Sequence, residues 1–293
     1  MNRRTFIAQS STAALAATLA PSAWALAPNN PYRKNIGIQL YTLRKAIGKD
    51  TKATLKAVAD AGYKQVEPYG YPNAGDMITA AKDYGMAVNS AHFAWEAVTS
   101  PDKKGVPAFD AILDQAKKDG LTHLVIPYLH GHERAGGLDA YKRLADLFNA
   151  AAAKAQTAGI QLAYHNHAFE FAPDAKGTSG YDILLSRCAP EMKFEIDVFW
   201  VKVAAHDPVS LMKKMAGRVS QLHLKDLAKE VKLPSYPGVP PEAFKELGNG
   251  QIAMAPIIEA ASAAGVAHCH VEQDHSPNPL KSVQDSMTYL QSL

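Results

Sequence analysis

Apolar and polar positions along the chain form a unit that recurs through most of its length: a short apolar run, then a longer amphipathic segment. Short apolar runs bounded by turn residues are typical of strands, whereas apolar positions three or four residues apart are typical of helices. The runs predict eight strands, at Ile36–Thr42, Gln65–Tyr69, Ala87–His92, His123–Tyr128, Gln161–His165, Lys193–Val198, Ser220–His223 and His268–Glu272.

The amphipathic segments between these runs predict helices at Thr51–Ala61, Ala74–Tyr84, Ala108–Lys118, Leu138–Ala158, Tyr181–Cys188, Asp207–Ala216, Ala255–Ala264 and Ser282–Leu293. Most of these helices lead into a glycine, where a left-handed residue commonly ends a helix. These glycines are Gly62, Gly85, Gly120, Gly159, Gly217 and Gly265. The chain is therefore expected to alternate strand and helix from beginning to end.

Regular alternation indicates parallel strand pairing, and eight units indicate closure. We therefore predict an α/β fold, a (β/α)8 TIM barrel that forms a single domain over residues 28–293. An open doubly wound sheet is the alternative, but no complete glycine-rich phosphate fingerprint follows the first strand, where Gln39–Arg44 stands. The Pro- and Gly-rich segment Glu230–Gln251 is expected to be a long loop over the barrel mouth and a candidate lid.

The first 27 residues have the layout of an export signal. Arg3 and Arg4 precede an apolar run over Ile7–Ala20, and Ala25-Leu26-Ala27 offers a small-x-small cleavage site. The arginine pair followed by Thr-Phe is typical of the twin-arginine route. The alternative is an uncleaved anchor, which the short, Ser-, Thr- and Pro-broken run disfavours. We expect a periplasmic protein without stable membrane association after cleavage.

The composition and charge of the chain limit the classes of binding partner that are expected. The formal net charge is +3, and no basic stripe typical of nucleic-acid binders is present, so no nucleic-acid partner is expected. A small carbohydrate is expected as the partner, and a homo-oligomer is left open. Cys188 and Cys269 do not make a disulfide framework, and the sequence leaves open whether they are bridged.

Chemically capable side chains gather at the carboxyl ends of the predicted strands, the end that carries the active site in this architecture. In chain order these strand ends carry Glu67, His92, His165, His167, Glu170, Glu195, Asp197, His223, Lys225, His270 and Glu272. The fifth to eighth strands each deliver an imidazole or a carboxylate to one half of the mouth. Such a mixed nitrogen and oxygen set suits one divalent ion, of manganese, zinc, cobalt, iron or magnesium, and is too rich in nitrogen for a calcium cage.

Each of these residues also has an ordinary interpretation. A lone histidine at a strand end is commonly a hydrogen-bonded rim residue, Asp197 is placed to cap the following helix, and Glu272 could pair with Lys225. The metal interpretation depends on the coincidence across four consecutive strands.

The segments LAYHNHAFEF, EIDVFWV, QLHLKD and HVEQD at these four strand ends resemble the sugar phosphate isomerase/epimerase family, within the xylose isomerase-like TIM barrel superfamily. IGIQLYTLR and VADAGYKQVEPYGY fit the same resemblance, which covers essentially the whole chain after the signal. It implies metal ligation by His165, Asp197, His223 and Glu272. The related endonuclease IV type needs a histidine three residues after the strand-six aspartate, where Trp200 stands instead.

His165 departs from the family pattern, because ketose epimerases of this superfamily usually carry there a glutamate that is also an acid/base group. The catalytic candidates are therefore Glu272, His167 and Glu170, with Lys225 placed to hold an oxyanion. Candidates for contact with a sugar are Glu67, His92, Tyr41, Trp95 and Trp200.

The resemblance implies isomerisation or epimerisation of a non-phosphorylated ketose or keto-sugar through an enediolate. Elimination from a 3-keto-glycoside uses the same proton abstraction and one base, and it is the alternative reaction. A non-catalytic periplasmic sugar-binding protein is the alternative from another class.

Overall fold

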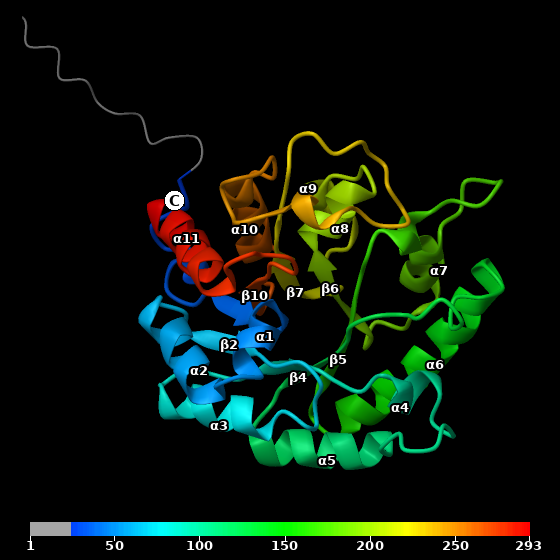
Figure 1. Cartoon of the computed structure of the whole chain (residues 1–293). Coiled ribbons are helices and arrows are strands. Elements are labelled where there is room, and N and C mark those ends of the chain that lie inside the picture. The colour runs from blue at the N-terminus through cyan, green and yellow to red at the C-terminus, as the bar shows by residue number, and fades with distance from the viewer. Residues whose placement is uncertain (1–24) are drawn as a thin grey trace, which may run out of the picture.

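The computed structural model describes residues 25–293, and its main element is a sheet of eight parallel strands. They are β1 (Gly37–Gln39), β2 (Gln65–Glu67), β3 (Ser90–His92), β4 (His123–Ile126), β5 (Gln161–His165), β6 (Lys193–Asp197), β7 (Val219–Leu224) and β10 (His268–Val271). Their order in the sheet is β2-β1-β10-β7-β6-β5-β4-β3. Each strand thus lies beside its neighbours in the chain, and the first strand, β1, also pairs with the last strand, β10 (Figure 1).

The sheet closes on itself between β2 and β3. The backbone N–H of Val66 donates to the carbonyl of Ala87, and the N–H of Ala87 donates to the carbonyl of Lys64, both at 2.9 Å. Nearer the mouth, the N–H of His92 donates to the carbonyl of Pro68 at 2.9 Å. These bonds complete the ring of strands, so the predicted (β/α)8 barrel is confirmed and the open doubly wound sheet is excluded.

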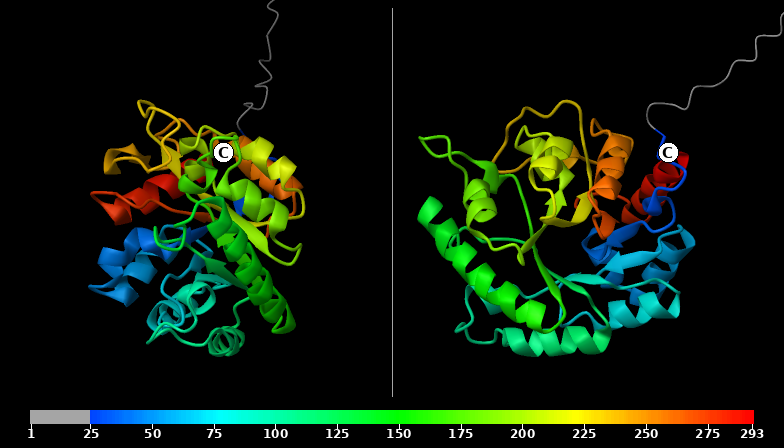
Figure 2. Two further views of the ribbon diagram at one scale, coloured as in Figure 1. Left: turned by 90° about the vertical axis from the view of Figure 1, so that its right-hand side faces the viewer. Right: turned by 180° about the vertical axis from the view of Figure 1, so that it is seen from behind.

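Helices surround the barrel on its outside, as the views in Figure 2 show. The eight predicted helices are α2 (Thr51–Asp60), α3 (Gly75–Asp83), α5 (Phe109–Asp119), α6 (Leu138–Thr157), α7 (Gly180–Arg187), α9 (Pro208–Lys214), α10 (Met254–Ala263) and α11 (Pro279–Ser292). Three short helices that the pattern did not predict are α1 (Arg44–Ile47), α4 (Glu96–Thr99) and α8 (Val198–Val203). Short 3-10 turns lie at Pro31–Arg33, Leu40–Leu43, Phe169–Phe171 and Pro241–Ala243.

Two predicted boundaries shift because a side chain caps the backbone. The first strand ends at Gln39 and not at Thr42, since the Gln39 side chain accepts the N–H of Tyr41 at 3.1 Å and starts a 3-10 turn. The last helix begins at Pro279, three residues before the predicted start. The Asn278 side chain accepts the N–H of Lys281 at 3.3 Å, and a proline is well suited to the first helical position.

The helices bury their apolar faces against the sheet. In α5, Phe109, Ile112, Leu113 and Ala116 are buried at helical spacing, and the helix ends at Gly120 in the left-handed conformation, with φ of 81°.

Alternate strand residues have opposite roles. On β6 and β7, Ile196 and Leu222 are fully buried in the apolar core. Glu195, Asp197 and His223 turn into the barrel, where His223 Nε2 lies 3.2 Å from Glu195 Oε2. The barrel interior near the mouth is therefore polar, and this alternation positions the site.

The segment Glu230–Gln251 is tied down at its base. Strand β8 (Asp226–Leu227) pairs antiparallel with β9 (Phe244–Lys245), and Phe244 stacks on Phe199 with ring centroids 4.4 Å apart. The Asp226 carboxylate accepts four backbone N–H groups at 2.8–3.0 Å, from Leu227, Gly248, Gly250 and Ile252. Residues 241–246 line a cavity of about 550 Å³ beside the mouth. The base of the segment is thus braced, and its role as a lid stays a prediction.

The chain is already packed on the barrel at residue 26. Leu26 is 4% exposed, and its N–H donates to the carbonyl of Leu293 at 2.8 Å. The N–H of Ala27 donates to the Glu259 carboxylate at 2.6 Å. The proposed boundary after Ala27 therefore lies inside packed structure, whereas the arginine pair and the apolar run lie outside the described residues.

Cys188 and Cys269 are both buried, free thiols. Within residues 25–293, no helix combines the length and the apolar character needed to cross a bilayer.

Candidate metal centre

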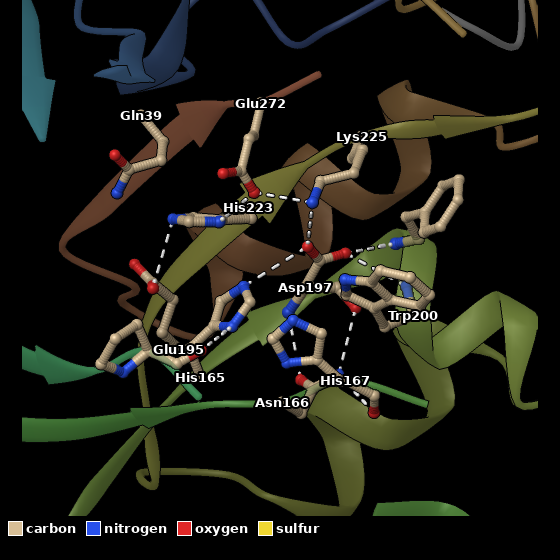
Figure 3. Close-up of polar contacts among 12 residues, drawn as sticks. Gln39, His165, Asn166, His167, Glu195, Asp197, Trp200, His223, Lys225 and Glu272 are labelled. Atoms are coloured by element: carbon tan, nitrogen blue, oxygen red, sulfur yellow. Dashed lines mark hydrogen bonds and ion pairs between the residues drawn. The ribbon is translucent and has the colours of Figure 1, made fainter. Parts of the chain in front are cut away.

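Four side chains from the ends of β5, β6, β7 and β10 converge at the barrel mouth, as Figure 3 shows. His165, Asp197, His223 and Glu272 each offer one donor atom, and these atoms all lie within 4.8 Å of one another. His165 Nε2 is 3.4 Å from Asp197 Oδ2, and His223 Nδ1 is 3.1 Å from Glu272 Oε2. The structure thus brings together the four residues that the family resemblance implied.

The donor atoms fit a divalent cation because His165 Nε2 is buried without a hydrogen-bond partner in the described structure, and Asp197 Oδ2 has the Lys225 ammonium, 3.0 Å away, as its ion-pair partner. Asp197 caps α8, as its ordinary interpretation predicts, but it does so with Oδ1, which accepts the N–H groups of Phe199 and Trp200. Oδ2 is left facing the other donors. A buried polar atom without a partner is costly, and a cation coordinated there would satisfy His165 Nε2.

The rings of His165 and His223 are each held by a contact to the nitrogen that faces away from the other donors. His165 Nδ1 lies 3.2 Å from the carbonyl of Pro127, and His223 Nε2 lies 2.8 Å from Glu67 Oε2. Burial lowers the pKa of His165, and a proton on its Nδ1 leaves Nε2 able to coordinate. Glu195 and Glu272 raise the pKa of His223 well above its ordinary value against the effect of burial, so a cation at Nδ1 would displace the proton there. Neutral imidazoles held in this way are typical ligands of zinc, manganese, iron and cobalt.

Lys225 places an ammonium group against the same carboxylates. Its Nζ lies 2.6 Å from Glu272 Oε2, 3.0 Å from Asp197 Oδ2 and 3.2 Å from Asp274. Burial alone would lower the pKa of Lys225, but the three carboxylates raise it well above its ordinary value. Burial would also raise the pKa of Asp197, and Lys225 and His165 lower it to about 2. The predicted Lys225–Glu272 pair therefore exists within the donor set, and both donor carboxylates are ionised.

A cavity of about 700 Å³ opens onto this cluster. Of the predicted site residues, its lining contains Tyr41, His92, Trp95, His165, His167, Lys225 and Glu272. Tyr69 and Tyr128 add two further aromatic rings. One wall of the cavity is therefore ionic and carries the donors His165 and Glu272, while Asp197 and His223 lie outside the lining. The rest is largely aromatic, a combination suited to a sugar that presents polar edges and an apolar face.

Glu67 does not lie in this lining, although the sequence suggested contact with a sugar. Its carboxylate is fully buried one layer deeper in the barrel, where Gln39, Ser90 and His223 bond it. Trp200 also lies outside the lining, and its ring packs behind His167 with centroids 5.2 Å apart.

Glu170 lies behind the mouth as well. Its carboxylate accepts the hydroxyl of Tyr164 at 2.5 Å and the backbone N–H of His167 at 2.9 Å. It therefore holds the strand-five turn from below, and it does not reach the cavity.

His167 does face the cavity, and burial, His165 and Lys225 lower its pKa well below the usual range. It is therefore a neutral imidazole at pH 7, and the lowered pKa makes it a weak proton acceptor.

The sequence reasoning gave no role to a second set of interior residues, among them Gln39, Glu195, Gln221, His270 and Asp274. The signal that could have found three of them is the two-residue spacing, because Glu195, Gln221 and His270 each stand two positions before a donor. Such residues occupy the next layer down inside the barrel.

Comparison with known proteins agrees with this architecture. The inosose dehydratase of Clostridium beijerinckii is 24% identical over 273 residues, covering 83% of this chain and 90% of that protein. A crystal structure of a sugar phosphate isomerase/epimerase from Parabacteroides distasonis is 26% identical, with a TM-score of 0.72, covering 87% of this chain and 97% of that one. The IOLI protein, solved with a bound zinc atom, shares the fold with a TM-score of 0.67 at 14% identity, covering 88% of this chain and 98% of that one.

The family model for the xylose isomerase-like TIM barrel matches residues 55–293. This match spans the strands that carry all four donors, and the chain is a member of the xylose isomerase-like TIM barrel family.

Proposed function

We propose that this protein is a divalent-metal-dependent enzyme that removes the proton beside the ketone of a non-phosphorylated keto-sugar. The observation that carries the proposal is the convergence of two imidazoles and two carboxylates on one point, where two of the four, His165 and Glu272, line a sugar-sized cavity. The zinc bound by the structurally similar IOLI protein supports it.

When bound, a divalent cation would act as a Lewis acid on the carbonyl and the adjacent hydroxyl, a contribution of several kcal/mol. The protein supplies the remaining steps. Glu272 belongs to the donor set and also lines the cavity, and Lys225 and His223 hold its pKa well below the ordinary range against the effect of burial. It is therefore an ionised base beside the carbon that would lose the proton.

Lys225 would stabilise the negative charge that develops on the enediolate oxygen. Its ammonium group is fixed by three carboxylates and borders the cavity, so the charge is already in place before the reaction begins. The second proton acceptor at the cavity is His167.

Elimination is the outcome that the site favours over epimerisation. Epimerisation returns a proton to the opposite face of the same carbon and needs a second acid/base group, the role usually filled by a glutamate at position 165. His165 contacts the backbone carbonyl of Pro127 through Nδ1 and faces Asp197 through Nε2, so its ring is oriented as a metal ligand. Elimination of a substituent one carbon further on can use one group for both proton transfers, because Glu272 would take the proton beside the ketone and return it to the departing hydroxyl or alkoxyl oxygen as the C–O bond breaks. Dehydration is an elimination, and the sequence relatives are inosose dehydratases.

The lining of the cavity also favours a neutral substrate. Lys225 is the one lysine or arginine in that lining, and three carboxylates already neutralise it. A phosphate group would require further cationic or N–H donors there. We therefore propose a free keto-sugar or a keto-glycoside as the substrate, and the periplasm as its location, on the basis of the twin-arginine sequence.

The test is a panel of keto-sugars and 3-keto-glycosides incubated with the enzyme in D2O and followed by NMR. We expect turnover that a chelator abolishes and a metal restores, with a product that has lost its β-substituent. Glu272→Gln should lower kcat at least a hundredfold, whereas the matched change at the exposed Glu230, Glu230→Gln, should leave it unchanged. Recovery of an epimer with deuterium at the carbon beside the ketone would select the epimerase instead. Binding of the panel without any turnover would leave a sugar-binding protein.

A further inference from the structure

A second group of donors lies one layer deeper in the barrel than the first. We propose that Glu67, His92, Glu195 and the Nε2 side of His223 form a second divalent-cation site. Binding of this ion displaces the Nε2 proton to solvent, so that His223 bridges two ions as an imidazolate. Each residue offers one donor atom, and these atoms all lie within 4.8 Å of one another. All four residues are buried, with exposures of 0% to 7%. The inference concerns occupancy and does not depend on the reaction proposed above.

The separations are those of ligands around one ion. His223 Nε2 lies 2.8 Å from Glu67 Oε2 and 3.2 Å from Glu195 Oε2. His92 Nε2 lies 2.9 Å from Glu195 Oε2 and 3.6 Å from Glu67 Oε2. Ligands about 2.1 Å from a zinc or manganese ion are themselves about 3 Å apart, so little movement is needed to admit a cation.

Each carboxylate presents one oxygen to the imidazoles and has the other held by a neutral donor. The Ser90 hydroxyl donates to Glu67 Oε1 at 2.6 Å, and the Gln221 amide donates to Glu195 Oε1 at 3.1 Å. A further amide, from Gln39, reaches Glu67 Oε2 at 3.1 Å. Carboxylates that coordinate a metal through one oxygen are commonly oriented in this way through the other.

His270 gives an independent indication that a ligand belongs here. Its side chain is fully buried, neither ring nitrogen has a hydrogen-bond partner in the described structure, and Nδ1 points at Glu67 Oε2 from 3.4 Å. The space for this ring exists because residue 37 is glycine, where a Cβ atom would fall 2.4 Å from His270 Cδ2. A fifth donor is therefore aimed at the cluster and has nothing to bond.

Charge balance points the same way. Five carboxylates lie in or beside the two clusters, and Lys225 is the one lysine or arginine that pairs with any of them in the described residues. They are Glu67, Glu195, Asp197, Glu272 and Asp274. One dication at the mouth leaves an excess of two negative charges in a medium that does not tolerate them. A second dication, which displaces the Nε2 proton of His223, reduces the excess to one negative charge. Protonation of two imidazoles is the competing solution.

An ion can reach the inner site from the mouth. His92 is a ligand of the inner cluster and also lines the main cavity, so it forms the boundary between them. Two carboxylates with two or three imidazoles suit zinc, manganese, iron or cobalt, as at the mouth.

The first test uses the unaltered protein. Protein stripped by a chelator is titrated with Zn²⁺, its bound zinc is counted by elemental analysis after gel filtration, and crystals are measured at the zinc absorption edge. We expect two zinc ions per chain and two anomalous peaks, the second between Glu67 and Glu195. One ion per chain, with a single peak beside Asp197, overturns the proposal and assigns the interior charge to protonated imidazoles.

Paired variants then identify each site by stoichiometry. Glu195→Gln removes a ligand of the inner site alone, and Asp197→Asn removes a ligand of the mouth site alone. Each should reduce bound zinc from two ions to one, with opposite peaks lost. Two ions retained in Glu195→Gln overturn the assignment of the inner ligands. Should that variant not fold, Glu67→Gln tests the same site, and the edge measurement on the unaltered protein needs no variant.

Discussion

Lys225 supplies the counter-charge of two donor carboxylates when no metal is bound, and its replacement by methionine tests that interpretation. The ammonium lies 2.6 Å from Glu272 and 3.0 Å from Asp197, two of the four donors. Any dication held by these oxygens is repelled by it. Two unit charges 4 Å apart interact by about 4 kcal/mol at an effective dielectric constant of 20, and a dication doubles this to about 8 kcal/mol.

That figure is an upper limit, because Lys225 also contacts Asp274 at 3.2 Å and can lean toward it. We expect Lys225→Met to tighten metal binding about 10- to 100-fold, which corresponds to about 1.4–2.7 kcal/mol. The metal-free variant should lose about 3–5 kcal/mol of unfolding free energy, because the carboxylates lose their counter-charge. Added metal should then restore stability by more in the variant than in the unaltered protein.

The assay is calorimetric titration with Mn²⁺ together with urea unfolding in chelator and in metal. Lys281→Met is the matched control, since Lys281 is an exposed lysine that pairs with Asp285 on α11. The reasoning is refuted if Lys225→Met binds Mn²⁺ no more tightly than the unaltered protein and its metal-free form is equally stable.

Four further outcomes are expected. Asp226→Ala leaves four backbone N–H groups without their acceptor and should cost about 3–5 kcal/mol in urea unfolding, against less than about 0.5 for an exposed aspartate; equal costs contradict the bracing role. Burial raises the pKa of Glu170 to about 7, so the folded protein keeps this proton at pH values where the unfolded chain has lost it. The free energy of unfolding, relative to that of Glu170→Gln, should therefore fall by roughly 3 kcal/mol from pH 4.5 to pH 7. A difference that does not change with pH contradicts this. His165→Glu should add epimerisation to the NMR product profile, and an unchanged profile argues against the ligand-only role. If the chain is exported as proposed, the intact mass of the mature protein should show Leu26 retained, because its burial contributes about 1.5–3 kcal/mol; a chain that begins at residue 28 contradicts this.

Much of the architecture was accessible from the sequence because its signals are local. Apolar spacing located the eight strands and eight long helices, and Gly120 ends α5 in the left-handed conformation that the pattern predicted. The boundaries that moved, at Gln39 and Asn278, depend on single side-chain caps that compete with strand or helix propensity.

Depth inside the barrel was the part that the sequence could not supply. Glu67 and His92 both end strands, yet His92 borders the cavity and Glu67 lies beneath His223. Strand tilt and stagger decide which layer each residue enters, and neither can be read from a short apolar run. For the same reason Glu195 and His270 were visible as neighbours of donors but were not recognised as a layer of their own.

The two oxygens of Asp197 have separate duties, since one caps α8 and the other faces the donors. Asparagine keeps a carbonyl oxygen for the helix and gives up the negative charge, so the residue offers a way to silence coordination while the backbone stays in register. Glutamate would keep the negative charge but not the helix cap, because its longer side chain moves the capping oxygen away from the first turn of α8. Substitution of Asp197 is therefore constrained by folding as well as by metal binding. A homologue that has lost activity is expected to carry Asn at this position more often than Glu.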